Sequence, residues 1–380
     1  MDNSDSDDDH FMVDQTAASK KRRRLKSISV LEKEDSFSPR TRNKMDELVV
    51  EFLHKTRVDT HDNSDSDDDH FINEQTPAAK KRRRLKLLTV LEKEDEFSLR
   101  TTNKMDELVV KFLHKTRVDI HDMLCEDDLG NDYDYHGLDD SRDTEAEVET
   151  AIRFFPEVLS RKKMARTDDD GLWFPGYYPI HYLASIQNDV DLLFVICNVK
   201  AVSFIPLIAR LAFELGLFEE EERGGLLLKG NGGSNVLRNL MLSDNRLYTR
   251  EHHESVDDKY LRILVQLRKM GLLKKEDIQS YGMLHKLCDQ FFYFAEKRFR
   301  FLVEWDPSAL LYSNVAMRGI PLHCTTFSCS LRGFQLVYEY GIRYYPKNKG
   351  INLLFKKKED DEDDEDNQTP FQAVCKKFGY

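Results

Sequence analysis

The sequence predicts an all-α protein: an irregular helical solenoid preceded by a disordered, duplicated N-terminal region with short amphipathic helices. From about residue 168, aromatic and aliphatic residues become dense and fall into helix-length blocks separated by Gly, Asn and Asp. Before that point, runs of acidic and of basic residues dominate the chain. Like-charge runs repel one another and bury too little apolar surface to offset chain entropy, so we expect them to be disordered.

These changes in composition divide the chain into four segments. They are a disordered charged region, its second copy with an amphipathic helix, an acidic linker with one helix, and a repeat domain whose last repeat is incomplete: residues 1–60, 61–120, 121–167 and 168–380. The linker helix is expected over residues 145–159. Pro156 kinks or ends it, because proline lacks the backbone N–H that a helix interior needs.

Composition excludes several classes of protein. The six cysteines form no CxxC pair, so we expect small buried thiols in a reducing compartment rather than a disulfide framework or a zinc site. The N-terminus lacks an apolar signal region. Apolar runs stay shorter than the ~18–20 residues that a membrane span needs. The sequence therefore predicts an intracellular protein with no cofactor, no metal and no membrane contact.

The N-terminal region is a tandem duplication. Residues 2–60 recur at 62–120 with differences at 13 of 59 positions. Each copy contains the acidic segment DNSDSDDDHF, the basic run KKRRRLK and an amphipathic segment, which spans residues 43–58 in the first copy and 103–118 in the second. The amphipathic segment carries apolar residues at helical spacing. Such a stripe has to be covered by the repeat domain, by its twin or by a partner.

The run KKRRRLK resembles a nuclear import signal, because six cations on a flexible chain can lie along the acidic groove of an import receptor. One alternative is a patch for nucleic-acid phosphates, although the nearby acidic runs and the lack of interleaved aromatic residues disfavour it. A merely solvated charge run is the other alternative. We expect a nuclear protein if the signal is used and a cytoplasmic one otherwise. The candidate residues are Lys20, Lys21, Arg22, Arg23, Arg24, Lys80, Lys81, Arg82, Arg83 and Arg84.

A short motif recurs in residues 168–380. It is clearest at 178–184, 282–288 and 319–325, and weaker at 369–374 and 234–240. The motif combines a proline, an apolar residue and a histidine, and its best-matching residues are Pro179, Ile180, His181, Leu284, His285, Pro321, Leu322, His323 and Pro370. It resembles the T-P-L-H-x-A that opens the first helix of the ankyrin-repeat family.

The resemblance implies a pair of helices in each repeat. It implies that the proline begins the first helix, that the apolar residue is buried and that the histidine forms a hydrogen bond between neighbouring turns. Candidate second helices lie at residues 202–215, 259–270, 295–305 and 331–345. Successive motifs are 56, 48, 38 and 49 residues apart. The family period is about 33 residues, so every unit carries an insertion.

The sequence does not predict an enzyme. The phosphate-binding, dinucleotide-binding, serine-hydrolase and zinc-protease motifs are missing. Side chains of His252 and His253 point apart because they are adjacent, so we do not expect a metal there. We predict a non-catalytic protein–protein interaction module, an ankyrin-like solenoid that binds an unidentified protein partner. The alternative is a nuclear regulator that contacts nucleic acid through the two KKRRRLK runs.

Overall fold

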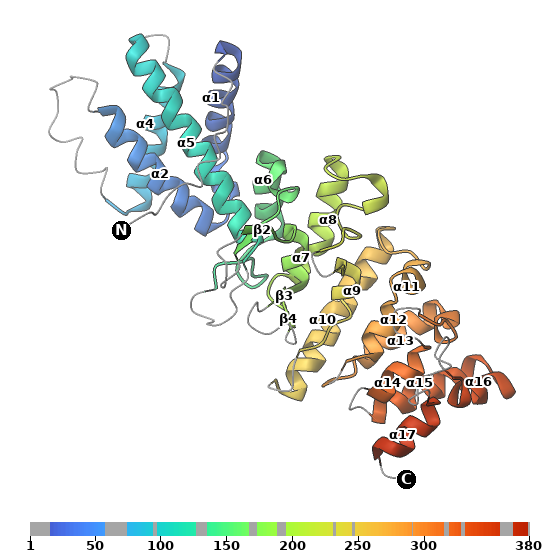
Figure 1. The fold of residues 1–380 in the computed structure, drawn as a ribbon. Coiled ribbons are helices and arrows are strands. Elements are labelled where there is room, and N and C mark those ends of the chain that lie inside the picture. The colour runs from blue at the N-terminus through green and yellow to red at the C-terminus, as the bar shows by residue number, and fades with distance from the viewer. Residues whose placement is uncertain are drawn as a thin grey trace, which may run out of the picture. The chain divides into compact units, whose positions relative to one another are not determined.

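The computed structural model describes residues 16–57, 74–93, 97–126, 135–166, 173–187, 195–230, 233–244, 248–290, 292–314, 319–327, 331–357 and 368–378. This part of the chain is mainly helical, with two short two-stranded sheets and one isolated bridge (Figure 1). The all-α prediction is confirmed at this level. None of the described helices is both long and apolar enough to cross a membrane.

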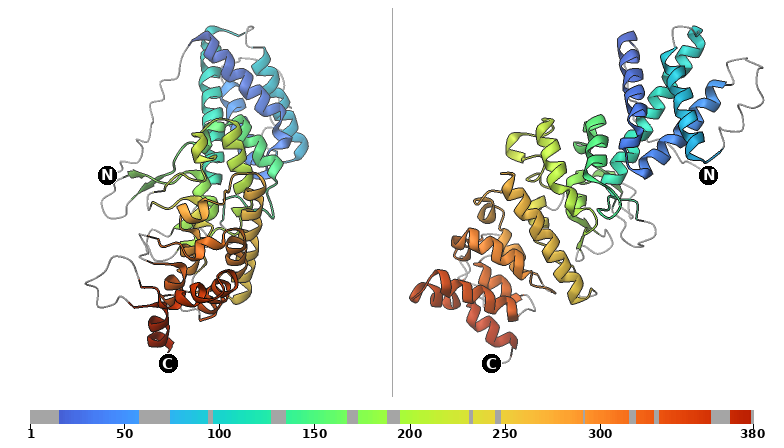
Figure 2. Two further views of the ribbon diagram at one scale, coloured as in Figure 1. Left: turned by 90° about the vertical axis from the view of Figure 1, so that its right-hand side faces the viewer. Right: turned by 180° about the vertical axis from the view of Figure 1, so that it is seen from behind.

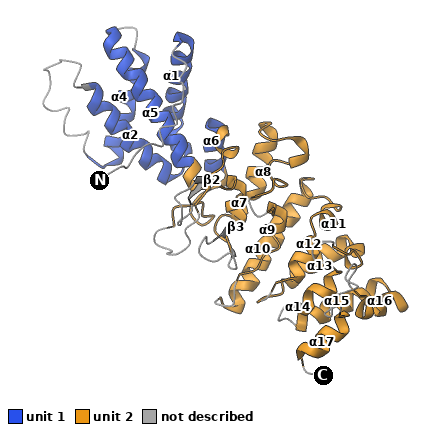
Figure 3. Ribbon diagram, viewed as in Figure 1, with its two compact units in different colours: residues 1–120, 146–155 blue, residues 121–145, 156–380 orange. Residues whose placement is uncertain are grey.

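The chain divides into two compact units (Figure 3). Unit 1 comprises residues 1–120 and 146–155, and unit 2 comprises residues 121–145 and 156–380. The segment expected as a linker is thus shared between the two units. Its predicted helix ends where Pro156 begins a short 3-10 turn.

Unit 1 contains two copies of a helical hairpin. Its elements are α1 (Ala17–Glu32), η1 (Glu34–Ser36), α2 (Pro39–Arg57), α4 (Pro77–Glu92), α5 (Leu99–Leu124) and α6 (Glu145–Phe154). The same caps begin the helices of both copies. Hydroxyl oxygens of Thr16 and Thr76 accept from the amide three residues on at 3.2 Å, and those of Ser38 and Ser98 do so at 3.3 Å. Such caps satisfy amides that the first turn leaves without partners.

The predicted disorder of residues 1–60 is wrong for residues 16–42, which form α1, η1 and the beginning of α2, whereas residues 43–57 of α2 lie in the segment that was expected to be helical. Two physical causes explain the difference. Val30, Leu31 and Phe37 are fully buried, and the buried Arg24 of the basic run forms an ion pair with Asp106 of the second copy. Residues 1–15 lie outside the described residues, so the prediction is not tested there.

Unit 2 begins with two short antiparallel hairpins and continues with alternating short and long helices. In the hairpins, Met164 of β1 pairs with Pro175 of β2, and Ser185 of β3 pairs with Cys197 of β4. The elements are η4 (Pro156–Leu159), β1 (Met164–Arg166), β2 (Trp173–Pro175), α7 (Pro179–Ala184), β3 (Ser185–Gln187), β4 (Val195–Cys197), η5 (Val202–Phe204), α8 (Ile205–Glu214), η6 (Glu220–Glu222), α9 (Val236–Asn239), α10 (Arg250–Lys269), α11 (Asp277–Ser280), α12 (Met283–Cys288), α13 (Glu296–Trp305), η7 (Pro307–Leu310), α14 (Pro321–Phe327), α15 (Leu331–Tyr344), α16 (Asn348–Asn352), η8 (Leu353–Phe355) and α17 (Pro370–Phe378).

Short helices α7, α9, α12, α14 and α17 each lie at a sequence motif, and each contacts the next in chain order. Longer helices follow them, and among these α8 contacts α10 and α10 contacts α13. Figure 2 shows this succession through unit 2. The predicted second helices are present, although α10 begins at Arg250 rather than at residue 259.

Candidate functional site

The three motif histidines make the same contact at three places in unit 2. Nε2–H of His181 donates to the carbonyl of Leu228 at 3.0 Å, and Nε2–H of His285 donates to that of Gly319 at 3.0 Å. His323 donates to the carbonyl of Lys356 at 2.9 Å. Each acceptor precedes the next short helix, α9, α14 or α17. The histidines therefore tie one short helix to the segment that leads into the next.

Burial keeps these imidazoles neutral. Desolvation lowers the pKa of His285 to about 4, against the opposing effect of its hydrogen bond to Gly319. Burial also lowers the pKa of His181. A neutral imidazole has one donor nitrogen, and here the backbone carbonyl takes it. All three histidines brace the backbone, and burial favours the neutral form of His181 and His285.

The other motif residues lie where the resemblance implies. Pro179, Pro321 and Pro370 are buried and occupy the first position of α7, α14 and α17. There the missing N–H breaks no helical hydrogen bond. The apolar motif residues Ile180, Leu284 and Leu322 are also buried.

A groove of about 830 Å³ opens in unit 2, and its lining does not include the three motif histidines. We call it the aromatic groove, and it is lined by Tyr248, Arg250, His253, Glu254, Asp257, Phe292, Tyr293, Phe294, Glu296, Lys297, Arg300 and Arg332. Its residues come from the beginnings of α10, α13 and α15 and from the segments before α10 and α13. Three helix N-termini, the positive ends of the helix dipoles, thus contribute to one groove.

Two of the groove's aromatic side chains are exposed, and two are held by stacking on histidines. Phe292 is 48% exposed and Tyr248 is 39% exposed. Tyr248 stacks on His252 with 4.2 Å between ring centroids, and Tyr293 stacks on His253 at 4.9 Å. Large rings that are fixed before binding lose little entropy when a partner covers them.

A buried carboxylate anchors the histidine beneath Tyr248. Asp244 Oδ2 lies 2.6 Å from His252 Nε2, and its Oδ1 accepts from the amide of Cys197 at 2.6 Å. His252 and His253 therefore face different partners. Among the described residues no group of three His, Cys, Asp or Glu side chains has the arrangement of a metal site.

Four cations and three carboxylates line the groove, which leaves an excess of one positive charge. The cations lie in ion pairs: Arg250 with Glu254, Lys297 with Asp258, and Arg300 and Arg332 with Glu296. The carboxylate of Asp257 is already engaged, because Arg298 beneath the groove lies 2.9 Å from it and both side chains are buried. The aromatic groove therefore suits a ligand with apolar and acidic groups.

Cys125 and His121 lie side by side, as the thiol and imidazole of a catalytic dyad would, but their geometry excludes that role. Cys125 Sγ lies 3.6 Å from His121 Nε2, and both residues are buried. That nitrogen also lies 3.1 Å from the carbonyl oxygen of Arg161. Because the carbonyl only accepts, the nitrogen carries the proton and cannot take one from the thiol.

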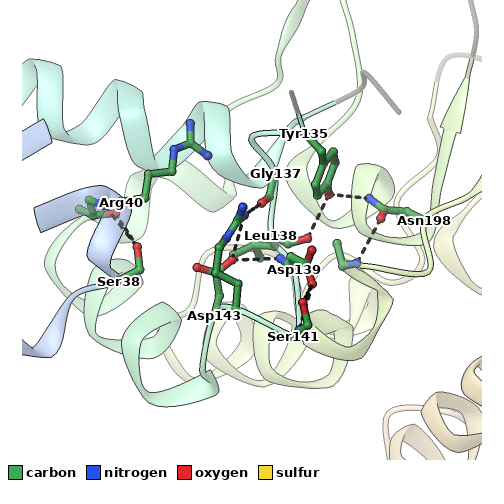
Figure 4. Close-up of polar contacts among 12 residues, drawn as sticks. Ser38, Arg40, Tyr135, Gly137, Leu138, Asp139, Ser141, Asp143 and Asn198 are labelled. Carbon is green, nitrogen blue, oxygen red and sulfur yellow. Dashed lines mark hydrogen bonds and ion pairs between the residues drawn. The ribbon is translucent and has the colours of Figure 1, made fainter. Parts of the chain in front are cut away.

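Figure 4 shows a polar network around Tyr135 in unit 2. Tyr135 donates to the carbonyl of Leu138 at 3.0 Å and accepts from the Asn198 side chain at 3.5 Å. The Asn198 side chain also donates to the carbonyl of Tyr182 at 2.9 Å. The Asn198 oxygen accepts from the amide of Ala201 at 3.1 Å. Burial raises the pKa of Tyr135 to about 12. These groups connect loops, so we assign the network to structure rather than to binding.

The two basic runs lie on α1 and α4, not on an extended chain. The premise that both runs are flexible is therefore wrong for these described residues. Arg83 is fully buried, and its guanidinium lies 2.6 Å from Asp46. Arg24 is also buried, 3.0 Å from Asp106.

Some residues of each run remain exposed. Lys21, Arg22, Lys81 and Arg82 are exposed, whereas Lys20, Arg23, Lys80 and Arg84 are half-buried. Nuclear import and nucleic-acid contact stay predictions, and they would depend mainly on the exposed four.

Sequence reasoning missed the aromatic groove. A signal was present, since residues 291–294 read Phe-Phe-Tyr-Phe between two predicted helices. Connecting segments are usually polar, so four consecutive aromatic residues in one indicate a packed or binding surface.

Comparison with protein families, with curated proteins and with solved structures finds no significant match.

Proposed function

We propose that this chain is a non-catalytic protein-interaction protein whose residues 168–380 form an ankyrin-like solenoid. The observation that carries the proposal is the recurring hydrogen bond of the motif histidines. His181, His285 and His323 each donate to a carbonyl that precedes the next short helix. A repeat that links only to its neighbour is the building principle of a solenoid.

The order of helix contacts supports the same proposal. Motif helices contact one another in sequence, and the longer helices α8, α10 and α13 do so as a second row. Two rows of helices bury a continuous core between them and leave extended surfaces for a partner.

We propose that the partner is a protein segment that carries an apolar side chain beside acidic ones, and that it binds at the aromatic groove. Exposed aromatic and arginine side chains dominate the energetics of protein interfaces. The groove combines Phe292 and Tyr248 with Arg250, Arg300 and Arg332. Seven of its twelve lining residues are charged, whereas a small-molecule site is lined mainly by apolar side chains, so the groove suits a peptide or loop better.

Affinity purification with quantitative mass spectrometry tests this proposal. The bait is the full chain as wild type, as a Tyr248→Ala/Phe292→Ala groove variant, and as a Phe213→Ala control. Phe213 is matched to Phe292, since it is 49% exposed but does not line the groove. Loss of two central aromatic residues costs about 2–4 kcal/mol or more at an interface. We therefore expect proteins captured by wild type and control to fall at least tenfold with the groove variant.

The same purification has an opposite outcome. If the groove variant keeps its melting temperature and captures the same proteins in the same amounts, the aromatic groove is not the binding surface. Equal loss with Phe213→Ala would place the binding surface elsewhere on unit 2.

The alternative function, nucleic-acid contact in the nucleus, has weaker support because Arg24 and Arg83 are engaged in buried ion pairs. Nuclear import, on which this alternative depends, is tested with a fluorescent fusion in which Lys21, Arg22, Lys81 and Arg82 are replaced by alanine. A nuclear signal that becomes cytoplasmic supports import through these residues. A distribution that does not change removes that support.

A further inference from the structure

The duplicated hairpins of unit 1 contact each other in equivalent pairs. Residues of the first copy correspond to residues 60 positions later in the second. Lys20 donates to Asn103 at 3.2 Å, and Lys80 donates to Asn43 at 2.9 Å. Exchanging the two copies turns one contact into the other. Contacts of this kind define an isologous interface, the type found in two-fold symmetric dimers.

A buried ion pair repeats in the same way. Arg24 of the first copy pairs with Asp106 of the second at 3.0 Å, and Arg83 of the second pairs with Asp46 of the first at 2.6 Å. Asp46 and Asp106 are equivalent. The arginines are offset by one position within the run of three, since Arg83 corresponds to Arg23. Each copy therefore contributes an arginine from its basic run to an aspartate on the second helix of the other.

The apolar surface is shared as well. Equivalent residues of the amphipathic stripe are buried in both copies, and helices of different copies contact each other, α2 with α4 and α1 with α4. The buried equivalent pairs are Leu31 and Leu91, Met45 and Met105, Val49 and Val109, and Phe52 and Phe112. The two hairpins thus contribute equivalent apolar residues to the surface between them.

One contact joins two equivalent residues. Lys111 donates to Glu51, and 51 and 111 are the same position in the two copies. Only residues at a two-fold axis meet their own equivalents, so this position marks the pseudo-two-fold axis. Lys55 and Lys115, which are also equivalent, approach Glu51 from the two sides at 2.8 and 3.5 Å.

The axis position is one of the few at which the copies differ. If two second copies paired with each other, Lys111 and Lys115 of one copy would face the same residues of the other, and the carboxylate of Glu51 would be missing. Like charges directly opposed disfavour that pairing. The second copy therefore requires the first copy, with Glu51, as its partner.

We propose that unit 1 is a self-association module whose docking surface accepts the hairpin of another molecule of this same chain, first copy against second copy. A surface that is complementary within one chain is complementary between two chains. The internal copy is preferred in the wild type because the linkage gives it a high effective concentration. Exchange of identical elements is a low-cost route to a dimer.

Two charge-exchanged full-length variants test this proposal. One variant carries Asp46→Arg and Asp106→Arg, and the other carries Arg24→Asp and Arg83→Asp. Each variant alone opposes like charges at both internal sites, whereas a mixture restores all four pairs between molecules. The measurement is the mass in solution, by light scattering after gel filtration, of each variant and of the equimolar mixture.

We expect each variant alone to remain at about 44.6 kDa and the mixture to shift to twice that mass. A mixture that stays monomeric overturns the proposal, and so does a variant that dimerises alone to the same extent. A single chain with all four substitutions is the folding control, because its charges are again complementary internally. It should be a monomer with a melting temperature close to that of wild type. If it is not, the charge pairs do not join the copies, and the proposal fails on that arm.

Discussion

In unit 1 a buried arginine of one copy meets a carboxylate of the other, whereas in unit 2 each motif histidine reaches a carbonyl of the segment ahead of it. Both units are built from repeated sequence. The copies in unit 1 are nearly identical and face each other across a pseudo-two-fold axis. The motifs in unit 2 are degenerate and contact one another in chain order.

The difference shows how similarity between repeats relates to their geometry. A hairpin with an apolar stripe, a basic run on its first helix and an aspartate on its second helix is its own complement, so two copies pair face to face. In unit 2 the histidine of one motif donates a hydrogen bond to the segment before the next short helix, so each motif pairs with its successor instead. Both arrangements bury apolar side chains; buried ion pairs join the copies of unit 1, whereas hydrogen bonds of neutral histidines join the motifs of unit 2.

The largest expected effect is that of Arg83→Ala in unit 1. Asp46 then remains buried without its ion-pair partner, which costs about 3–5 kcal/mol. Hydrogen exchange followed by mass spectrometry should show faster exchange in α2 and α4 and no change in α12 and α14. The control is Lys81→Ala, whose side chain is exposed. Equal protection of α4 in both variants would contradict the role given to this ion pair.

Leu322→Ala is the corresponding change in unit 2. Leu322 is fully buried, and truncation of a buried leucine costs about 2–5 kcal/mol. Both tryptophans of the chain lie in unit 2, so denaturant unfolding followed by tryptophan fluorescence reports on this unit. Leu331→Ala, at a more exposed leucine, should change stability by less than about 0.5 kcal/mol. If the two variants unfold together, Leu322 is not part of the core.

Acid should lower the stability of unit 2 at a higher pH than that of unit 1, and this effect is smaller than the two above. The folded pKa of His285 is about 4, below its ordinary value of 6.5, so the unfolded state binds more protons between these values. The stability contributed by neutral His285 is complete above pH 6.5 and is lost as pH falls toward 4. Glu51 of unit 1, whose pKa Lys111 lowers to about 2, loses its contribution only below about pH 4.5.

Urea unfolding at pH 7 and pH 5 measures this difference. The tryptophan transition of unit 2 should shift to lower urea at pH 5, and His285→Gln should reduce the shift. Were the wild type and His285→Gln to shift equally, another group would be responsible.

The motif helices of unit 2 were predictable because local signals agree there. Pro179 and Pro321 mark helix beginnings, and the apolar residues after them repeat in sequence. The start of α10 was missed because residues 250–258 are mostly polar, and the cap is a single threonine, Thr249. Both β hairpins were missed because three residues are too few to establish a period of two.

In unit 1 the amphipathic helices and the helix after residue 145 were predicted, but α1 and α4, which carry the basic runs, were missed for a different reason. A run of cations on its own predicts disorder, because self-repulsion is counted along the sequence. Asp46 and Asp106, the carboxylates that neutralise it, lie in the other copy and far away in sequence. The prediction that the apolar stripe must be covered was sound, and its twin is among the surfaces that cover it.

The facing arrangement of the two copies has a direct test at the axis. Glu51→Cys and Lys111→Cys are introduced together, and a short bis-maleimide is added at low protein concentration. Each single substitution is the control for reaction at native cysteines. Peptide mapping should find positions 51 and 111 joined within one chain in high yield. If the two positions are not linked while each reacts readily with a mono-maleimide, the copies do not meet across a two-fold axis.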